Sequence, residues 1–374
     1  MPGAGRSPAV AYPCPVTQRL RGPVRIVGTG LLGSSIGMGL TRLGVEVTLA
    51  DVSPTAVRLA ADYGAGRPAG LGDAPVLVVV AVPPDVTADV VARELDAHRD
   101  AVVIDVASVK APILADLRAA GADVSRYLGT HPMAGRERSG ALAGRADLFV
   151  GRPWVVADHD AITYARGSVV DDLILDLGAI PIEMDPEEHD RSVATVSHVP
   201  QLVSTLMGAR LQDAADEALR LAGQGVRDVT RVAGSDPALW VQILSANAPA
   251  VAEQLRALRA DLDRLVDALD DVDREGARRT LADVLADGRA GVERLPGKHG
   301  QRSRFTRIAV RVDDRPGQLA RLLTDIGDAN VNMEDVRLEH AEGAQFGVAE
   351  ILIAPETEQR LLEALDARGW AVVS

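Results

Sequence analysis

The sequence predicts an α/β sheet domain, followed by an all-helical domain and a small α+β domain. Three patterns predict this order. Apolar strand-like runs alternate with helical patterns over residues 24–184, residues 187–295 show no strand pattern, and residues 305–374 follow the order β-α-β-β-α-β. The alternation favours a doubly wound, mostly parallel sheet, and the last order is typical of a ferredoxin-like unit.

The elements of the sheet domain follow from apolar runs and helical spacing. Helices are expected over 31–43 and 86–97, from residue 112 onward, and up to residue 177. Strands are expected over 24–27, 45–50, 76–82, 101–105, 127–130, 154–157 and 179–183.

The first strand leads into a glycine-rich turn, Gly28-Thr-Gly-Leu-Leu-Gly33, and the second strand ends in Asp51. Gly28 permits the tight turn, Gly30 lets backbone approach a pyrophosphate, and Gly33 lets helix and strand pack closely. The helix N-terminus offers free N–H groups to phosphates, and Asp51 can accept hydrogen bonds from a ribose. This βαβ unit predicts a Rossmann-type dinucleotide site. The alternative is a glycine-rich turn that binds nothing.

The expected cofactor is NAD rather than NADP. The Asp51 carboxylate repels a 2′-phosphate, and the following residues Val52 and Ser53 provide no arginine to hold one. The residues expected at the cofactor are Gly28, Gly30, Leu31, Leu32, Gly33, Asp51, Val82, Pro83 and Ser108.

Composition excludes several classes of protein. The net charge of −13 argues against a nucleic-acid surface, and Cys14 is the only cysteine, so an intrachain disulfide is excluded. No apolar stretch approaches the roughly 20 residues that a membrane helix needs. We expect a cytoplasmic protein whose residues 1–22 form a disordered tail, with an organelle transit peptide as the alternative.

The region 186–295 is expected to form a helical dimerisation and substrate domain. One of its long helices carries Leu255, Leu258, Leu262, Leu265 and Leu269 along one face. Such wide apolar faces cannot bury themselves alone, which favours a homodimer. The alternative is a monomer in which these faces pack on the sheet domain.

The expected domain organisation has five parts. They are the tail 1–22, the nucleotide-binding domain 23–185, the helical domain 186–295, a polar linker 296–304 and the ferredoxin-like domain 305–374. In the last domain, strands are expected over 305–312, 331–338, 345–354 and 370–373, with helices over 319–326 and 356–368.

Two residues after predicted strands could carry chemistry. His131 and Ser108 reach the edge of the sheet that borders the cofactor crevice, where a histidine can take a proton near neutral pH. A structural role is the alternative for each.

No convincing metal-ligand spacing occurs, so no metal is expected. The histidines expected to be solvated are His98, His159, His189, His299 and His340.

Three motifs together resemble those of prephenate/arogenate dehydrogenases of tyrosine biosynthesis. They are Asp105-Val-Ala-Ser-Val-Lys110, Gly129-Thr-His-Pro-Met-Ala-Gly-Arg-Glu-Arg-Ser-Gly140 and Arg227-Asp-Val-Thr-Arg-Val-Ala-Gly-Ser-Asp-Pro-Ala-Leu-Trp240. The C-terminal unit, with Asp314-Arg-Pro-Gly-Gln-Leu319, is similar to an ACT domain, a regulatory module that binds amino acids.

The resemblance implies roles for individual residues. His131 matches the catalytic histidine, Ser108 the serine that aligns the substrate hydroxyl with it, and Arg231 the arginine that holds a substrate carboxylate. The other matches, which shape or line the substrate pocket, are Glu137, His198, Asp228 and Trp240. The family often carries a second histidine three residues after His198, where this chain has Gln201.

The resemblance implies an NAD-dependent oxidative decarboxylation of prephenate or arogenate, with His131 as base. For the ACT-like domain, our hypothesis is that it binds an aromatic amino acid near Gly317 and Asn330, at an interface between two copies. The alternative for this domain is a dimerisation module without ligand. The alternatives for the function of the chain are an amino-deoxyprephenate dehydrogenase, a β-hydroxyacid dehydrogenase and a non-catalytic sensor of NAD and amino acids. A β-hydroxyacid dehydrogenase would use a lysine on the helical domain, but the only lysines are Lys110 and Lys298.

Overall fold

The computed structural model describes residues 18–134, 140–295, 305–340 and 346–373. Cys14, Glu137 and the expected linker 296–304 lie outside the described residues. The chain divides into two compact units, one up to Leu258 and one from Arg259 onward. The first unit holds the sheet domain and most of the helical region.

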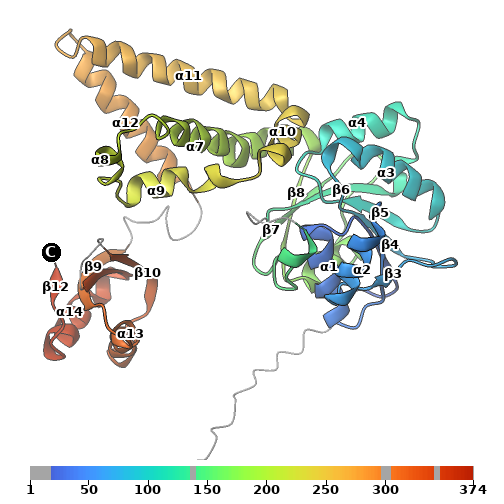
Figure 1. Ribbon diagram of the computed structural model, residues 1–374, viewed down its shortest axis with the longest axis horizontal. Coiled ribbons are helices and arrows are strands. Elements are labelled where there is room, and N and C mark those ends of the chain that lie inside the picture. The colour runs from blue at the N-terminus through green and yellow to red at the C-terminus, as the bar shows by residue number, and fades with distance from the viewer. Residues whose placement is uncertain (1–17, 135–139, 296–304, 341–345, 374) are drawn as a thin grey trace, which may run out of the picture. The chain divides into compact units, whose positions relative to one another are not determined.

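An eight-stranded sheet forms the centre of the first unit, in the order β3-β2-β1-β4-β5-β6-β7-β8 (Figure 1). Neighbouring strands run parallel except for β6 and β7, which are antiparallel, so the sheet is mostly parallel as predicted. The strands are β1 (Val24–Val27), β2 (Val47–Ala50), β3 (Arg67–Pro68), β4 (Leu77–Val80), β5 (Val102–Asp105), β6 (Tyr127–Pro132), β7 (Pro153–Ala157) and β8 (Ile180–Met184).

Helices cover both faces of this sheet, which explains why its central strands are apolar throughout. In β4, Leu77 and Val79 face a core that includes α1, whereas Val78 and Val80 face a second core that includes α3 and α4. Strands buried on both faces read as continuous apolar runs. The helices are α1 (Leu31–Arg42), α2 (Pro54–Asp62), α3 (Pro84–Ala97), α4 (Ala111–Ala119) and α5 (Val169–Asp176).

Two features near the start of the chain differ from expectation. Helix α2 was not expected, although Ser53 caps it by accepting a hydrogen bond from the Ala56 N–H and Pro54 occupies its first turn. The second difference lies in residues 18–22, which were expected to belong to a disordered tail. Leu20 is fully buried, and its backbone N–H donates to the Asp176 carboxylate at 2.9 Å.

The helical region begins with α6 (Pro186–Val193), a π-helical turn (Ala194–His198) and α7 (Val199–Arg210). The Val199 N–H donates to the Ala194 carbonyl, five residues back. Pro200 has no N–H to continue the α-helical pattern, which accounts for a wider turn at this point. The remaining helices of the first unit are α8 (Asp216–Leu219), α9 (Gln224–Thr230), α10 (Pro237–Ala246) and the first part of α11 (Ala248–Asp270).

Helix α10 begins with a proline that follows a capping aspartate. Pro237 lies in its first turn, and the Asp236 carboxylate accepts a hydrogen bond of 2.9 Å from the Ala238 N–H. Within the part of the chain that the structure describes, no helix has the length and apolar character to cross a membrane.

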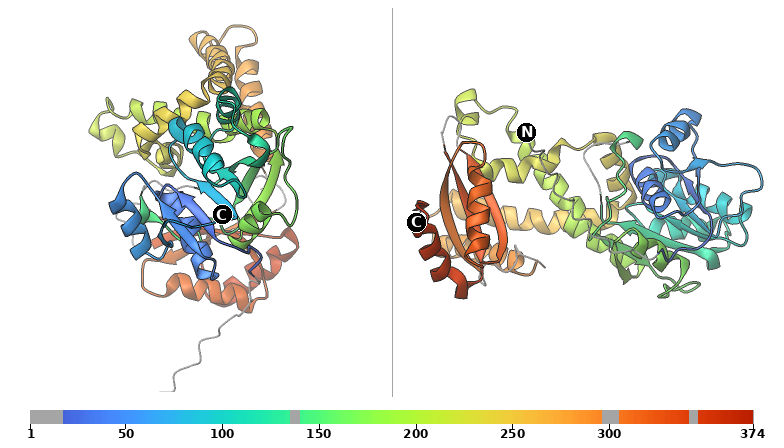
Figure 2. Two further views of the ribbon diagram at one scale, coloured as in Figure 1. Left: turned by 90° about the vertical axis from the view of Figure 1, so that its right-hand side faces the viewer. Right: turned by 90° about the horizontal axis from the view of Figure 1, so that it is seen from below.

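The second unit contains the end of α11, then α12 (Ala277–Glu293) and a four-stranded antiparallel sheet in the order β10-β11-β9-β12. Figure 2 shows this sheet with its two helices. Its elements are β9 (Thr306–Asp313), α13 (Gln318–Asp328), β10 (Met333–His340), β11 (Phe346–Ile353), α14 (Glu358–Ala367) and β12 (Val372–Val373), in the predicted order β-α-β-β-α-β.

Candidate functional site

The carboxyl ends of the parallel strands bring distant residues to one edge of the sheet. Gly28 follows β1, Val82 and Pro83 follow β4, Ser108 follows β5, and His131 lies near the end of β6. The strand order reverses between β1 and β4, and ligands of doubly wound sheets bind in the crevice at such a point.

The three glycines of the turn have the geometry that a dinucleotide needs. Gly28 has a φ of +99°, and a Cβ there would lie 2.3 Å from the Ala81 carbonyl oxygen. A Cβ on Gly33 would lie 2.0 Å from the Gly28 carbonyl oxygen, so helix α1 can approach β1 only through glycine. At Gly30 a Cβ would meet nothing within 4 Å, which leaves open space where a pyrophosphate would lie.

Asp51 is held in place by the same turn. One carboxylate oxygen accepts hydrogen bonds from the Thr29 N–H at 2.8 Å and the Thr29 hydroxyl at 2.9 Å, and the other accepts from the Ser53 N–H at 2.9 Å. A carboxylate has about four acceptor positions, so Asp51 retains one for a ribose hydroxyl.

His131 is joined to a buried histidine and a buried carboxylate. Its Nδ1 lies 2.9 Å from Nε2 of His189, and Nδ1 of His189 lies 2.8 Å from Oδ1 of Asp190. His189 is fully buried and Asp190 nearly so. The Asp190 carboxylate also accepts the backbone N–H groups of Lys110 at 2.9 Å and Ala111 at 3.0 Å, at the start of α4.

Asn247, between α10 and α11, connects this group to His198. Its side-chain amide donates to the Asp190 carbonyl at 2.8 Å and lies 3.1 Å from Nδ1 of His198. The His198 ring meets the Trp240 ring edge to face, with centroids 6.0 Å apart. A connected series of contacts therefore runs from His131 to Trp240, with one link through the Asp190 backbone carbonyl.

Burial favours the neutral form of the three histidines in this series of contacts, His131, His189 and His198. Burial is the largest cause that lowers the pKa of His131 well below 6.5, and the neighbouring His189, Lys110 and His198 add to it. Burial also lowers the pKa of His189, against the opposing effect of its hydrogen bond to Asp190. For His198, burial lowers the pKa to about 4. A neutral His131 can accept a proton.

The other residues predicted for the substrate pocket have different surroundings. Gln201 is buried on α7, and its amide donates to the Val232 carbonyl at 2.9 Å. Arg231 and Asp228 are exposed. Asp228 accepts a hydrogen bond from Gln224, and the Arg231 side chain forms no hydrogen bond or ion pair to any described residue. Among the described residues, no hydrogen bond or ion pair joins Arg231 or Asp228 to the series of contacts that begins at His131.

The expectation of solvated histidines was wrong for His189 and His159. The His159 side chain is only 3 % exposed, and its Nε2 lies 2.9 Å from the Tyr127 carbonyl oxygen. His189 was missed because the segment around it is charged. Helical spacing offered a signal, because His189 shares the buried face of α6 with Pro186 and Val193. Asp190, Asn247 and the buried Lys110 were missed as well.

Comparisons with known proteins identify the family of this chain. Residues 36–182 match the family model described as prephenate dehydrogenase, nucleotide-binding domain, and residues 185–283 match prephenate dehydrogenase, dimerization domain. A Streptomyces niveus protein described as probable prephenate dehydrogenase NovF is 37% identical over 353 residues, which cover 92% of this chain and 98% of the relative.

Solved structures of prephenate and arogenate dehydrogenases are also similar to this chain. The chain is 27% identical to Aquifex aeolicus prephenate dehydrogenase, solved in complex with hydroxyphenyl propionate and NAD⁺, with a TM-score of 0.62 and 71% and 96% of the two chains covered. It is 25% identical to Synechocystis arogenate dehydrogenase, with a TM-score of 0.61 and 72% and 100% covered.

Proposed function

The chain belongs to the prephenate dehydrogenase family, and we propose that it oxidatively decarboxylates prephenate or arogenate with NAD as the hydride acceptor. The observation that carries this proposal is His131. It lies near the carboxyl end of β6, at the same edge of the sheet as the glycine turn after β1, in surroundings that keep it neutral.

The residues supply positioning and proton transfer. When bound, NAD supplies a hydride acceptor for C4 of the substrate ring. His131 takes the proton of the 4-hydroxyl, with Ser108 aligning that hydroxyl, as the C4–H bond breaks. The bond from the ring to its carboxylate then breaks, CO₂ leaves, and the electron pair makes the ring aromatic. The proton returns from His131 to the phenolic oxygen, so no net proton is released.

The remaining roles follow the family motif. Arg231 holds a substrate carboxylate with its planar guanidinium, a geometry suited to that task. His198, Gln201 and Trp240 line the pocket, and Asp228 and Glu137 shape its entrance. Leu31, Leu32, Val82 and Pro83 would help to hold the cofactor, and Asp51 would favour NAD over NADP.

The first experiment is a measurement of NADH formation with prephenate and arogenate offered separately, each with NAD⁺ and then NADP⁺. We expect turnover with NAD⁺ and one of the two substrates. The variant His131→Asn should abolish turnover but keep NAD binding. Absence of turnover with either substrate would favour the amino-deoxy substrate or a non-catalytic sensor, and equal kcat/KM for both cofactors would contradict the role of Asp51.

Gln201 is the residue to change when substrate choice is tested. Its amide nitrogen is engaged by the Val232 carbonyl, so its oxygen remains as an acceptor for the side chain of the substrate. The variant Gln201→His places the residue common in the family at this position. We expect it to change the ratio of kcat/KM for prephenate and arogenate, and an unchanged ratio would remove Gln201 from substrate recognition.

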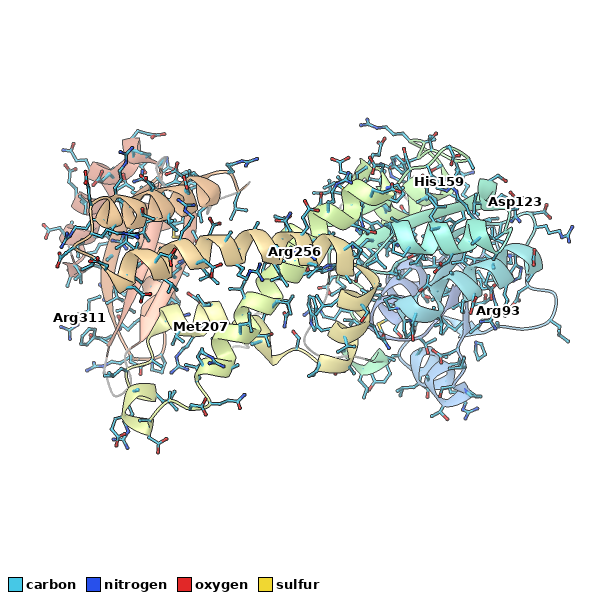
Figure 3. The ribbon with its side chains drawn as sticks, turned by 90° about the horizontal axis from the view of Figure 1, so that it is seen from above. Arg93, Asp123, His159, Met207, Arg256 and Arg311 are labelled. Carbon is cyan, nitrogen blue, oxygen red and sulfur yellow. The ribbon has the colours of Figure 1, made fainter. Side chains whose placement is uncertain are left out.

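We further propose that the chain forms a homodimer through its helical region. Several apolar side chains on α7 and α10 are exposed in the single chain, including Leu206 (63%), Met207 (42%, labelled in Figure 3) and Val241 (64%). Light scattering coupled to gel filtration tests this. We expect a dimer whose association is weakened by Leu206→Glu, and a monomer at micromolar concentration would contradict it.

The last part of the proposal concerns the second unit. Residues 305–373 act as an ACT-like regulatory module that binds an aromatic amino acid near Gly317 and Asn330. The support is the strand order, together with positive φ angles of +87° at Gly317 and +54° at Asn330, at the two ends of α13. Unchanged activity and melting temperature with millimolar tyrosine, phenylalanine or tryptophan would reject it.

A further inference from the structure

We propose that His189 is a positioning residue that fixes the tautomer of His131, so that neutral His131 presents the lone pair of Nε2. The inference about the tautomer stands on hydrogen-bond geometry. Its consequence for catalysis rests on the proposed function.

The argument begins at Asp190. Backbone N–H groups can only donate, and those of Lys110 and Ala111 point to the two oxygens of this carboxylate. Oδ1 accepts the Lys110 N–H and also lies 2.8 Å from Nδ1 of His189. The start of α4 further favours a negative charge here. A carboxylate is acceptor only, so His189 must donate from Nδ1.

The protonation of His189 follows from this bond. A neutral imidazole carries one proton, and in His189 that proton is on Nδ1. Its Nε2 therefore has a lone pair, 2.9 Å from Nδ1 of His131. Two lone pairs cannot form a hydrogen bond, so His131 must donate from Nδ1 and keep its own lone pair on Nε2.

This arrangement suits a general base. When His131 takes a proton at Nε2, its Nδ1–H remains bonded to His189, so the ring need not turn during the reaction. The charged and titratable groups around the two rings are Lys110 before α4, Asp105 at the end of β5, Asp190 on α6 and His198 in the π-helical turn. The two carboxylates raise the pKa of His189, whereas Lys110 lowers the pKa of both rings.

Nuclear magnetic resonance of the full-length protein tests the tautomer directly. Histidine labelled with ¹⁵N is incorporated, and long-range ¹H–¹⁵N correlations are recorded well above pH 6.5, with His131 assigned by comparison with His131→Asn. We expect the Nδ1–H tautomer for both His131 and His189. The Nε2–H tautomer at His131 would overturn the proposal.

Kinetics test the consequence with a pair of variants. His189→Leu removes the acceptor and should lower kcat by about 10²- to 10⁴-fold while leaving the KM for NAD⁺ unchanged. His189→Gln offers an amide oxygen to Nδ1–H of His131, so it should retain at least about tenfold more kcat than the leucine variant. Equal loss in both variants would show a packing role and contradict the proposal.

The control variant is His159→Leu. His159 is a buried histidine of the same domain (labelled in Figure 3), bonded to a backbone carbonyl and separate from the series of contacts that begins at His131. We expect it to leave kcat unchanged. A loss equal to that of His189→Leu would show that removing any buried histidine has this effect, and would contradict the proposal.

The two measurements separate this inference from the proposed function. The Nδ1–H tautomer in a protein without turnover would support the positioning by His189 but reject the dehydrogenase activity. Turnover together with the Nε2–H tautomer would support the activity and reject the positioning.

Discussion

The Lys110 ammonium lies buried against the carboxylate of Asp105, five residues earlier in the chain. It also donates to the Thr130 carbonyl at 2.8 Å, and Asp105 accepts the Tyr127 hydroxyl at 2.7 Å. These contacts join the ends of β5 and β6 immediately before His131. Lys110 therefore supports the strand end that carries the proposed base.

Replacement of Lys110 should destabilise the fold strongly. Lys110→Met keeps a long side chain but leaves the Asp105 carboxylate buried without its cation. Breaking a buried ion pair in this way costs about 3–5 kcal/mol of unfolding free energy. Urea denaturation followed by circular dichroism measures this change.

The matched control is Arg118→Met, which removes the same charge from an exposed pair with Asp160. Exposed pairs contribute less than about 1 kcal/mol, so this variant should unfold almost like the parent. Similar losses in the two variants would contradict the importance of burial at Lys110.

The glycine turn predicts different outcomes for two alanine variants. Gly33→Ala brings a Cβ within 2.0 Å of the Gly28 carbonyl oxygen, so helix α1 must shift and the melting temperature should fall. Gly30→Ala meets nothing within 4 Å and has a φ of −71°, so the fold should tolerate it. Its methyl group would occupy the space of the pyrophosphate, and NAD⁺ binding should weaken. Calorimetry measures the melting temperature of Gly33→Ala and the NAD⁺ affinity of Gly30→Ala. An unchanged NAD⁺ affinity in Gly30→Ala would contradict the cofactor site.

The sequence predicts the cofactor edge well because its signals are local. A glycine turn, an apolar strand and a terminal acid lie within one βαβ unit, and backbone sterics determine each position. The partner of His131 could not be predicted in this way. His189 lies 58 residues further on, in a charged segment that resembles the exposed start of a helix. Its burial depends on packing against β6 and α4, which no local pattern encodes.

The pH dependence of activity should reveal a neutral base. Burial and the neighbouring His189, Lys110 and His198 hold the pKa of His131 well below 6.5. The profile of kcat/KM reports the free enzyme, so its acid limb should lie below pH 6.5. An acid limb at or above pH 6.5 would contradict the neutral state of His131. His98→Gln, which changes a histidine outside the site, should leave the profile unaltered.

The stability of the protein should also fall in mild acid because of His198. Burial lowers its folded-state pKa to about 4, below the unfolded value of 6.5. The unfolded chain then binds more protons between these values, so the stabilisation is complete above pH 6.5 and is lost as the pH falls towards 4. The shift corresponds to about 3 kcal/mol.

Thermal unfolding of the parent and of His198→Gln measures this contribution. The glutamine does not titrate but keeps an acceptor for Asn247. The parent should lose more stability than the variant between about pH 7 and about pH 5. Parallel curves would show that His198 does not titrate in this range.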